Sequence, residues 1–382
     1  MITHPKRLMA LLMAFGLVAA ACGSSDDTET TEAAAEDEIA GVDLSGVCPA
    51  TIAFQLDWNP ESEHGAMYEM VGKEGYTLDS NSFVVSGDLV SQGEDTGVDI
   101  EVRSGGPAVG FQSPLSVMYQ DESVTFAYAT TDDAYNSYDQ FPSVSVVAPL
   151  EINPQIIMWD PATYPDVKTI ADLPDDTIVR YFNGGAYMDY LVASGQVLES
   201  QLDSSYDGTP AVFIAEGGKI AQQGFATSEP FAYKNEITEW GKDVAYELIN
   251  DTGYRVYAAS IALRAADLAD MTPCLEKLVP VIQQAQVDYA NSPDASNALI
   301  VEAVEANDNG WIYSADIAAF SIEAQLAEGL VGNGPDSTLG NFDDARLAEV
   351  FEILSTTVYP DAAPVTPADL YTNDFIDESI GL

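Results

Sequence analysis

One short stretch, LDWNPESEHGAMY at 56–68, gathers the side chains of this protein that are best suited to chemistry. It holds Trp58, Glu61, Glu63 and His64, and the whole sequence has only two histidines. Tryptophan offers an aromatic face for stacking, and its ring nitrogen and the histidine can hydrogen-bond. Because the stretch follows a strand-like run, we expect Trp58 and His64 at the mouth of a strand, with both glutamates on the surface beside them.

The sequence has no motif of an enzyme or of a metal centre. It lacks a Gly-x-Ser-x-Gly nucleophile turn and a Gly-Lys-Ser/Thr phosphate loop, and VGNGPDS at 331–337 lacks the third glycine of a dinucleotide-binding motif. It has no CxxC, and its other histidine, His4, lies in the expected leader. With 62 Asp and Glu, a pair of carboxylates is no evidence for catalysis. We therefore expect no enzyme, no metal and no cofactor.

The N-terminus has the pattern of an exported protein. Two basic residues precede an uncharged run at 8–21 that is too short to span a bilayer, which predicts a secretory signal over 1–21. The AAAC that ends at Cys22 resembles the lipobox of bacterial lipoproteins, in which this cysteine carries lipid. The alternative is an ordinary signal with an incidental cysteine. The acidic, Ser/Thr/Ala-rich continuation predicts a disordered tether, so that 22–46 anchor an extracytoplasmic protein to the cell membrane.

Charge and cysteine count restrict the partners further. The formal net charge is −49, and loss of the leader's two basic residues takes it to about −51. Such a charge excludes nucleic acid and resembles that of proteins exposed to high external salt. If Cys22 is lipidated, Cys48 and Cys274 are left as an even pair in an oxidising compartment. We expect a disulfide between them, and two buried thiols are the alternative.

Hydrophobic patterning predicts an α/β protein, since strand-like and helix-like runs alternate as in parallel sheets with crossover helices. The strand-like runs are 50–58, 98–103, 124–130, 143–149, 176–182, 209–215 and 254–263, and the helix-like runs are 63–75, 187–198 and 218–226. After about Ala265 the pattern changes to long helical stretches, at 274–289 and 343–356.

Six motifs lie along the chain in the order seen in a known family. They are LDWNPESEHGAMYEMVGKEGY, GVDIEVRSGGPAVGFQS, TIADLPDDTIVRYFNGGAYMDYL, QQGFATSEPFAYKNEI, DTGYRVYAASIALR and LYTNDFIDESIGL. Together they resemble solute-binding proteins of ABC transporters, most closely the branch for thiamine pyrimidine precursors, which is related to nitrate, sulfonate and taurine binders. The residues at 77–96 depart from the family pattern as an insertion.

The resemblance implies a two-lobed periplasmic-binding-protein fold of type II, in which each lobe is a sheet with flanking helices and a cleft lies between the lobes. We expect lobe one to comprise 47–147 and 260–382 and lobe two to comprise 148–259. Two crossings between the lobes would form a hinge that permits closure on a small solute.

Four loops at the expected carboxyl ends of strands carry the candidate ligand-binding residues, because α/β sheets bind ligands there. The candidates are Trp58 and His64 in the first loop, Gly105, Gly106, Phe111 and Ser113 in the second, Asn183, Gly184, Gly185 and Tyr187 in the third, and Glu229 in the fourth. Glycine lets a backbone approach a ligand, and a helix opening at Ala186 would point free N–H groups at it. The alternatives are a core position for Trp58, a helix cap for His64 and a plain turn for the first glycine pair.

Glu229 precedes a proline, which favours a connecting turn. The pyrimidine-binding relatives place a carboxylate at this point, facing the ligand ring; the alternative is a surface acid. Only eleven Lys and Arg remain after the leader, and the candidate motifs contain just Arg103 and Arg180, both within strands. Aromatic faces with a carboxylate suit a nitrogen heterocycle, such as an aminopyrimidine or a flavin precursor, better than an anion.

The resemblance therefore implies a monomeric, membrane-anchored lipoprotein that delivers a small-molecule solute, a thiamine-precursor pyrimidine or a similar heterocycle, to the permease of an ABC importer. Binding of nitrate, sulfonate, taurine or a riboflavin-like solute is one alternative, and a ligand-sensing subunit of a membrane receptor is another. A pyrimidine-synthase enzyme in the wider family uses a Cys-rich iron site and a lysine-bound cofactor, for which the cysteines and histidines here do not suffice.

Overall fold

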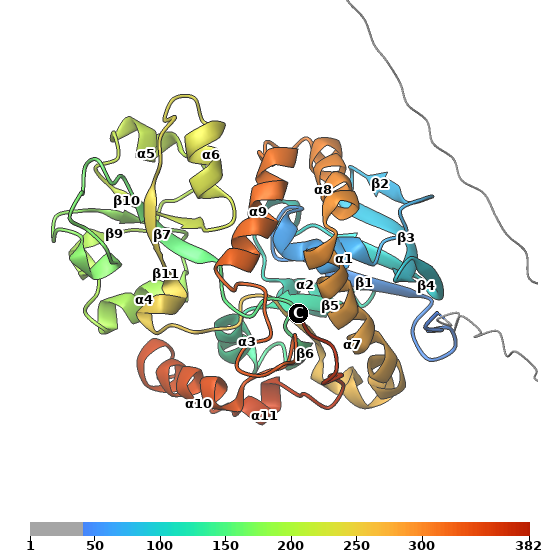
Figure 1. Ribbon diagram of the computed structural model, residues 1–382. Coiled ribbons are helices and arrows are strands. Elements are labelled where there is room, and N and C mark those ends of the chain that lie inside the picture. Colours follow the sequence, from blue (N-terminus) through green and yellow to red (C-terminus); the bar gives the residue numbers. More distant parts are fainter. Residues whose placement is uncertain (1–40) are drawn as a thin grey trace, which may run out of the picture. The chain divides into compact units, whose positions relative to one another are not determined.

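Two β-sheets organise the computed structural model, which describes residues 41–382 (Figure 1). The expected signal, Cys22 and the tether up to residue 40 lie outside the described residues. The first sheet has the strand order β2-β3-β4-β1-β5-β12-β6. Its strands are β1 (Thr51–Gln55), β2 (Thr77–Asp79), β3 (Val84–Ser91), β4 (Glu94–Arg103), β5 (Phe126–Ala129), β6 (Ser143–Val147) and β12 (Ser260–Arg264).

The second sheet has the order β11-β7-β10-β8-β9. Its strands are β7 (Gln155–Trp159), β8 (Val179–Arg180), β9 (Leu202–Asp203), β10 (Ala221–Phe225) and β11 (Ala245–Leu248). Both sheets are mixed and not purely parallel: β1 is parallel to β4 and β5, whereas β12 is antiparallel to β5 and β6. Likewise β7 is antiparallel to β10 and β11.

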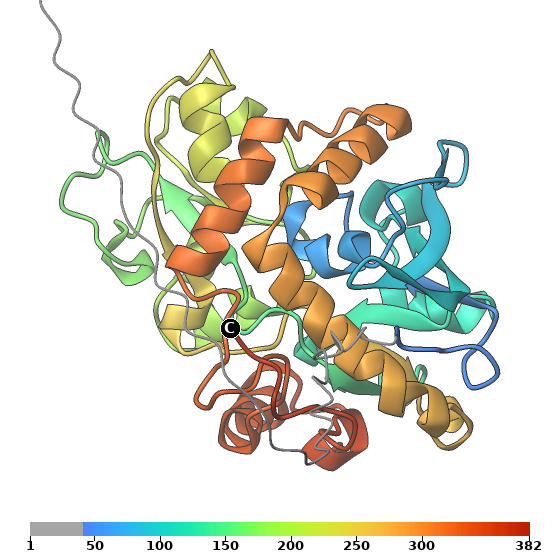
Figure 2. The ribbon, with the colours of Figure 1, turned by 45° about the vertical axis from the view of Figure 1, so that its right-hand side comes forward.

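The helices flank the sheets. They are α1 (Gly65–Glu69), α2 (Pro114–Gln120), α3 (Thr131–Ser137), α4 (Ala186–Ala193), α5 (Ala211–Ala215), α6 (Glu229–Asn235), α7 (Leu268–Asn291), α8 (Asp294–Asn307), α9 (Ala315–Ala327), α10 (Asp344–Ile353) and α11 (Pro367–Leu370). After β12 the chain is helical: α7 packs on α1 and β6, and α9 contacts both α8 and α6 (Figures 1 and 2). Within residues 41–382 no helix has the length and apolar character needed to cross a membrane.

The residues at 77–96, the expected insertion, add two antiparallel strands to the edge of the first sheet. β2 pairs with β3, and β3 pairs with β4 through Ser91 and Glu94. The two residues between that pair, Gln92 and Gly93, have φ of 51° and 84°. Positive φ at both central residues is what a tight hairpin turn requires, because its twist then matches that of the strands.

Two neighbouring predictions of secondary structure were wrong. The run at 209–215 was expected as a strand but contains helix α5, and 218–226 was expected as a helix but contains strand β10. A short apolar run does not distinguish the two structures by its periodicity. In β10 the polar residues are buried: the Gln222 side chain donates to Tyr233 Oη over 2.8 Å, and Gln223 accepts from Tyr187 Oη over 2.6 Å.

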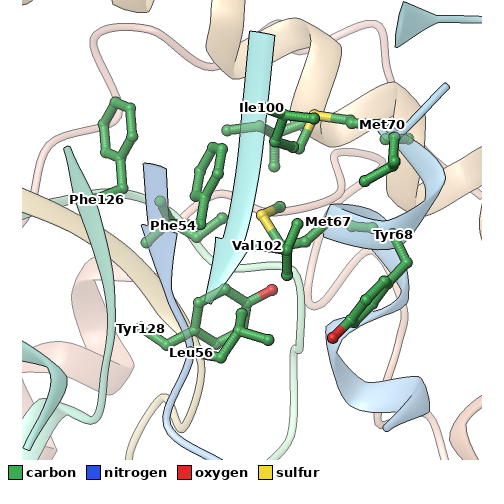
Figure 3. Close-up of a cluster of buried hydrophobic side chains, with 14 of the residues drawn as sticks. Phe54, Leu56, Met67, Tyr68, Met70, Ile100, Val102, Phe126 and Tyr128 are labelled. Carbon is green, nitrogen blue, oxygen red and sulfur yellow. The ribbon is translucent and has the colours of Figure 1, made fainter. Parts of the chain in front are cut away.

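Strand β1 is buried on both faces, which fixes the point at which the loop after it leaves the sheet. Figure 3 shows Phe54 of β1 and Leu56, which directly follows it, among side chains of β4, β5 and the α1 region; the labelled neighbours are Ile100, Val102, Phe126, Tyr128, Met67, Tyr68 and Met70. The rings of Phe54 and Phe126 stack with centroids 5.2 Å apart. This packing holds Asp57 and Trp58 at the carboxyl end of the strand.

Cys48 and Cys274 are joined by a disulfide bond that ties the segment before β1 to α7. We expect a Cys22→Ser variant of the full chain, denatured without reductant, to show no thiol that reacts with a thiol reagent, because both remaining cysteines are bonded. After reduction the same sample should show two. Two reactive thiols before reduction would contradict the bond.

A buried arginine of the C-terminal section holds both segments that connect the sheets, 148–154 and 249–259. Arg346 of α10 donates to the carbonyl oxygens of Glu151, Arg255 and Val256 over 2.6, 2.7 and 3.1 Å. It also pairs with the Glu151 carboxylate at 3.1 Å and lies over the Tyr257 ring, 3.7 Å from its centroid. The C-terminal section thus bonds to both connections at once.

Candidate ligand-binding site

A cavity of ≈ 160 Å³ is lined by residues that follow strands of both sheets and by residues of the two segments that connect the sheets. The chain before β6 and after β12 contributes Asp57, Trp58, Glu61, Glu63, His64 and Trp311. The part from β7 to β11 contributes Phe182, Tyr206, Gly208, Gln223, Gly224, Phe225 and Glu229, and the segments that connect the two sheets contribute Leu150, Pro154, Ala258 and Ala259. The cavity therefore draws on residues from Asp57 to Trp311, which only the fold brings together.

Three of the residues expected from the sequence line this cavity: Trp58, His64 and Glu229. The others, Gly105, Gly106, Phe111, Ser113, Asn183, Gly184, Gly185 and Tyr187, are not among its lining residues. Those eight lie in the loops and helices that support the lining residues.

Gly105 and Gly106 hold the loop that carries Trp58. Their N–H groups donate to the carbonyl oxygens of Trp58 and Asp57 over 2.7 and 3.0 Å. A Cβ on Gly105 would lie 2.3 Å from the Leu56 carbonyl oxygen, and one on Gly106 would lie 2.7 Å from the Trp58 ring. Glycine is therefore needed at both positions so that the backbone at 105–106 can approach the loop that carries Trp58, and not so that it can approach a ligand.

Phe111 and Ser113 follow in the same segment but do not line the cavity. Phe111 is 64 % exposed and packs its ring against Trp58, with centroids 6.0 Å apart. The Ser113 hydroxyl accepts from the Ser116 N–H over 3.2 Å and caps α2. Both residues help to place the first loop.

The third loop presents an aromatic ring to the cavity instead of free N–H groups. Asn183 and Gly184 are exposed, and Gly185 precedes the first residue of α4. Phe182, just before them, lines the cavity. Tyr187 is buried, and Gln223 accepts hydrogen bonds from its hydroxyl at 2.6 Å and from the Phe182 N–H at 2.9 Å. Residues 183–187 do not line the cavity, so the start of α4 at Ala186, which was expected to point N–H groups at the ligand, is not part of the cavity wall.

Glu61 and Glu63 were expected on the surface, and this expectation is wrong: both line the cavity, and Glu63 is only 6 % exposed. All three residues of the short helix at Ser62–His64 are buried, which sequence spacing did not indicate. Burial and the neighbouring carboxylates raise the pKa of Glu61 well above its usual range. Burial also raises the pKa of Glu63. The hydrogen bond that its carboxylate accepts from the Thr227 hydroxyl lowers the pKa, but burial has the larger effect.

Glu229 is the first residue of helix α6, not part of a connecting turn as its proline neighbour suggested. Proline is well tolerated in the first turn of a helix because its missing N–H has no partner there. The Glu229 carboxylate accepts from the Phe225 N–H over 2.7 Å. Burial raises its pKa to about 7, in spite of that bond.

His64 is fixed by Asp57. Its Nε2 lies 2.7 Å from Asp57 Oδ1, and its ring packs edge-on against Tyr128. The Nδ1 atom of His64 is buried and has no hydrogen-bond partner. The Oε2 atom of Glu63 is likewise buried and without a partner. Two residues that line the cavity, His64 and Glu63, thus each have one buried polar atom without a hydrogen-bond partner.

Aromatic side chains form the rest of the wall. The Trp58 ring meets Trp311 and Phe182 edge-on, at centroid distances of 5.9 and 5.8 Å, and Phe182 meets Tyr206 at 4.9 Å. Sequence reasoning missed Trp311, Phe182, Tyr206 and Phe225. Of these, only Phe182 could have been found from the sequence, because it precedes the Asn-Gly-Gly turn that was already a candidate. Trp311 lies before helix α9 in the C-terminal section, where no motif pointed to a site.

The cavity lining has a marked imbalance of charge. It includes four carboxylic residues, and none of the described residues that line it is Lys or Arg. Among residues 41–382 no group of His, Cys, Asp and Glu is arranged to hold a metal ion.

Comparison with known proteins places the fold. No family model matches the chain, and no curated protein matches it. A solved protein from Bordetella bronchiseptica RB50 is similar at 16 % identity and TM-score 0.53, over 86 % of this chain and 96 % of that one. The ligand-binding component of an ABC-type import system from Staphylococcus aureus, solved with zinc bound, has 12 % identity and TM-score 0.55, over 87 % and 100 %.

The periplasmic aliphatic sulphonate binding protein SsuA of Escherichia coli is also similar, at 12 % identity and TM-score 0.53, over 81 % of this chain and 86 % of that one. Identities this low leave the fold as the shared feature. The chain accordingly has the two-lobed periplasmic-binding-protein fold of type II, as the sequence motifs implied.

Proposed function

We propose that this protein is a solute-binding protein, not an enzyme, that delivers a single-ring nitrogen heterocycle such as a thiamine-precursor pyrimidine to an ABC importer. The observation that carries the proposal is a small inter-lobe cavity whose wall combines aromatic rings with Asp57, Glu61, Glu63 and Glu229 and lacks Lys and Arg. Carboxylates form strong hydrogen bonds with ring and amino nitrogens, and aromatic faces stack on the ring. Solved proteins of the same fold include import-system components.

The size of the cavity supports one ring. A cavity of about 150 Å³ in another protein is known to bind benzene, and the cavity here measures ≈ 160 Å³. A flavin, with three fused rings, would need much more room. The volume therefore favours a pyrimidine over the riboflavin-like alternative.

The charge of the wall argues against the anionic alternatives. Nitrate and sulfonates need fixed positive charge or many donors. Arg180 of β8 is held by Asp203 at 3.4 Å and Asp207 at 4.0 Å. Arg103 is held by Glu101 and Asp121 at 2.5 and 3.0 Å. Neither guanidinium lines the cavity.

The remaining parts of the proposal rest on the sequence. Lipid on Cys22 and the acidic tether would hold a monomer outside the cytoplasm at the cell membrane, where it would meet the permease of its importer.

A thermal-shift screen with pyrimidines, flavins, nitrate and sulfonates tests the proposed function. A ligand that binds only the folded state at a hundredfold excess over its Kd stabilises that state by about 2.7 kcal/mol. We expect an aminopyrimidine to give the largest shift. A larger shift with nitrate or a sulfonate, or no shift with any ring compound, would contradict the proposal.

Glu229→Gln should weaken binding of the solute found in that screen by about ten- to a hundredfold, because a charge-assisted hydrogen bond contributes about 1.5 to 3 kcal/mol. Isothermal titration calorimetry measures the effect. The matched control is Glu216→Gln, which removes an exposed carboxylate at the end of α5 and should bind like wild type. Equal affinity of both variants would exclude Glu229 from recognition.

A further inference from the structure

The ionisable groups around the cavity are all acidic except one. From the chain before β6 and after β12 they are Asp57, Glu61, Glu63, His64, Tyr68, Tyr128, Tyr289 and Tyr313, and from the part between β7 and β11 Tyr206, Tyr233 and Glu229. Burial raises the pKa of each of these six tyrosines, so they are neutral at pH 7. The one basic group, His64, is already bonded to Asp57.

The carboxyl groups have few hydrogen-bond donors of their own. Glu63 has the Thr227 hydroxyl on one oxygen and no partner on the other, and Glu229 has the Phe225 N–H. Glu63 is more than nine-tenths buried and lines the cavity. Several negative charges repel one another in so small a space without a counter-charge, and the pKa values of Glu61, Glu63 and Glu229 are raised, so the carboxyl cluster holds protons when no solute is bound.

We propose that the solute binds in its positively charged form, as an ammonium or a protonated ring nitrogen, and that its binding displaces a proton from the carboxyl cluster of Glu61, Glu63 and Glu229 into solvent. The proposal rests on the proposed function and specifies the charge of the solute. In this exchange a carboxyl O–H bond breaks, the proton goes to water, and the cation takes its place beside the carboxylate.

The aromatic wall supports a cation as the occupant. Trp58, Trp311 and Phe182 all line the cavity, and the Trp58 ring packs edge to face with the other two. Aromatic faces attract cations, tryptophan most strongly, and the attraction grows when water is excluded. A neutral ring would gain the stacking but not this electrostatic contribution.

The proposal fixes the sign of the pH dependence. Below the pKa of about 7 of Glu229, the carboxyl must lose its proton before a cation can take its place. Affinity for a permanent cation should therefore rise with pH up to about 7, by up to about tenfold per pH unit for one proton released, and then level off. A neutral solute would show no such rise.

The test uses full-length protein and three cationic rings: 4-aminopyridine, benzamidine and N-methylpyridinium, with aniline and toluene as neutral counterparts. We expect at least one cation to bind more tightly than the neutral ring it resembles: 4-aminopyridine more tightly than aniline, or benzamidine or N-methylpyridinium more tightly than toluene. Calorimetry at pH 7 in two buffers of different ionisation enthalpy should show release of a fraction of a proton up to one proton per cation bound. Glu63→Gln and Glu229→Gln should reduce that number, and Glu216→Gln should leave it unchanged.

The outcomes separate this inference from the proposed function. Binding of a neutral aminopyrimidine without proton release, and more tightly than any cation, would overturn the inference and leave the proposed function standing. Failure of every cationic ring to bind would overturn the inference as well. Preference for nitrate or sulfonates would overturn both.

Discussion

Arg346→Met should lower the free energy of unfolding by about 3 to 5 kcal/mol, because removing one partner of a buried ion pair leaves the other groups unpaired in a low-dielectric interior. The Arg346 side chain is 1 % exposed. Without it, the Glu151 carboxylate and the carbonyl oxygens of Glu151, Arg255 and Val256 lose their donors. Urea denaturation of the unliganded protein measures the loss.

The matched control is Arg255→Met. Arg255 is 44 % exposed, and its partner Glu349, 3.7 Å away, is 69 % exposed. A pair in such contact with water contributes about 0 to 1 kcal/mol. If both variants lost the same stability, the bonds of Arg346 to the two connecting segments would have no particular energetic role.

The unliganded protein should become more stable as the pH falls from about 8 to about 5, with a contribution from Glu229 of at most about 3 kcal/mol. The pKa of this carboxyl is raised from 4.5 to about 7. In that window the folded state binds the proton more tightly than the unfolded state does. The stabilisation is therefore complete below pH 4.5 and is lost as the pH rises through about 7. The Glu229 side chain is only half-buried, so solvent screening reduces its contribution below this upper value.

Urea midpoints at a series of pH values, compared between wild type and Glu229→Gln, isolate this contribution from the repulsion of the whole acidic chain. In Glu229→Gln the urea midpoint should rise less on acidification than it does in wild type. In Glu216→Gln, which removes an exposed charge, the midpoint should change with pH as in wild type. Parallel pH curves for wild type and Glu229→Gln would show that the cavity does not raise the pKa of this carboxyl.

Local sequence patterns predicted many of the strands and helices of the fold. The run at 50–58 was recognised as a strand because its central residues Ile52, Ala53 and Phe54 are apolar and are buried on both faces of β1. Gly105 and Gly106 lie where the chain passes close to the Leu56 backbone and to the Trp58 ring. Local patterns did not separate α5 from β10, because a five-residue run can be apolar on all sides in either structure, and because the buried glutamines of β10 are satisfied by side chains distant in sequence.

The sequence by itself determined the types of residue available to the site: few cations, many carboxylates, and aromatic side chains after strands. Only the tertiary structure decided which of them meet. Glu61 and Glu63 look like surface acids in a chain with 62 Asp and Glu, and Trp311 looks like a residue of the helical section. They line one cavity with Phe182 and Glu229 because the fold brings segments that follow strands of both sheets together. Burial, which raises the pKa of these carboxyl groups, depends on contacts that no local pattern records.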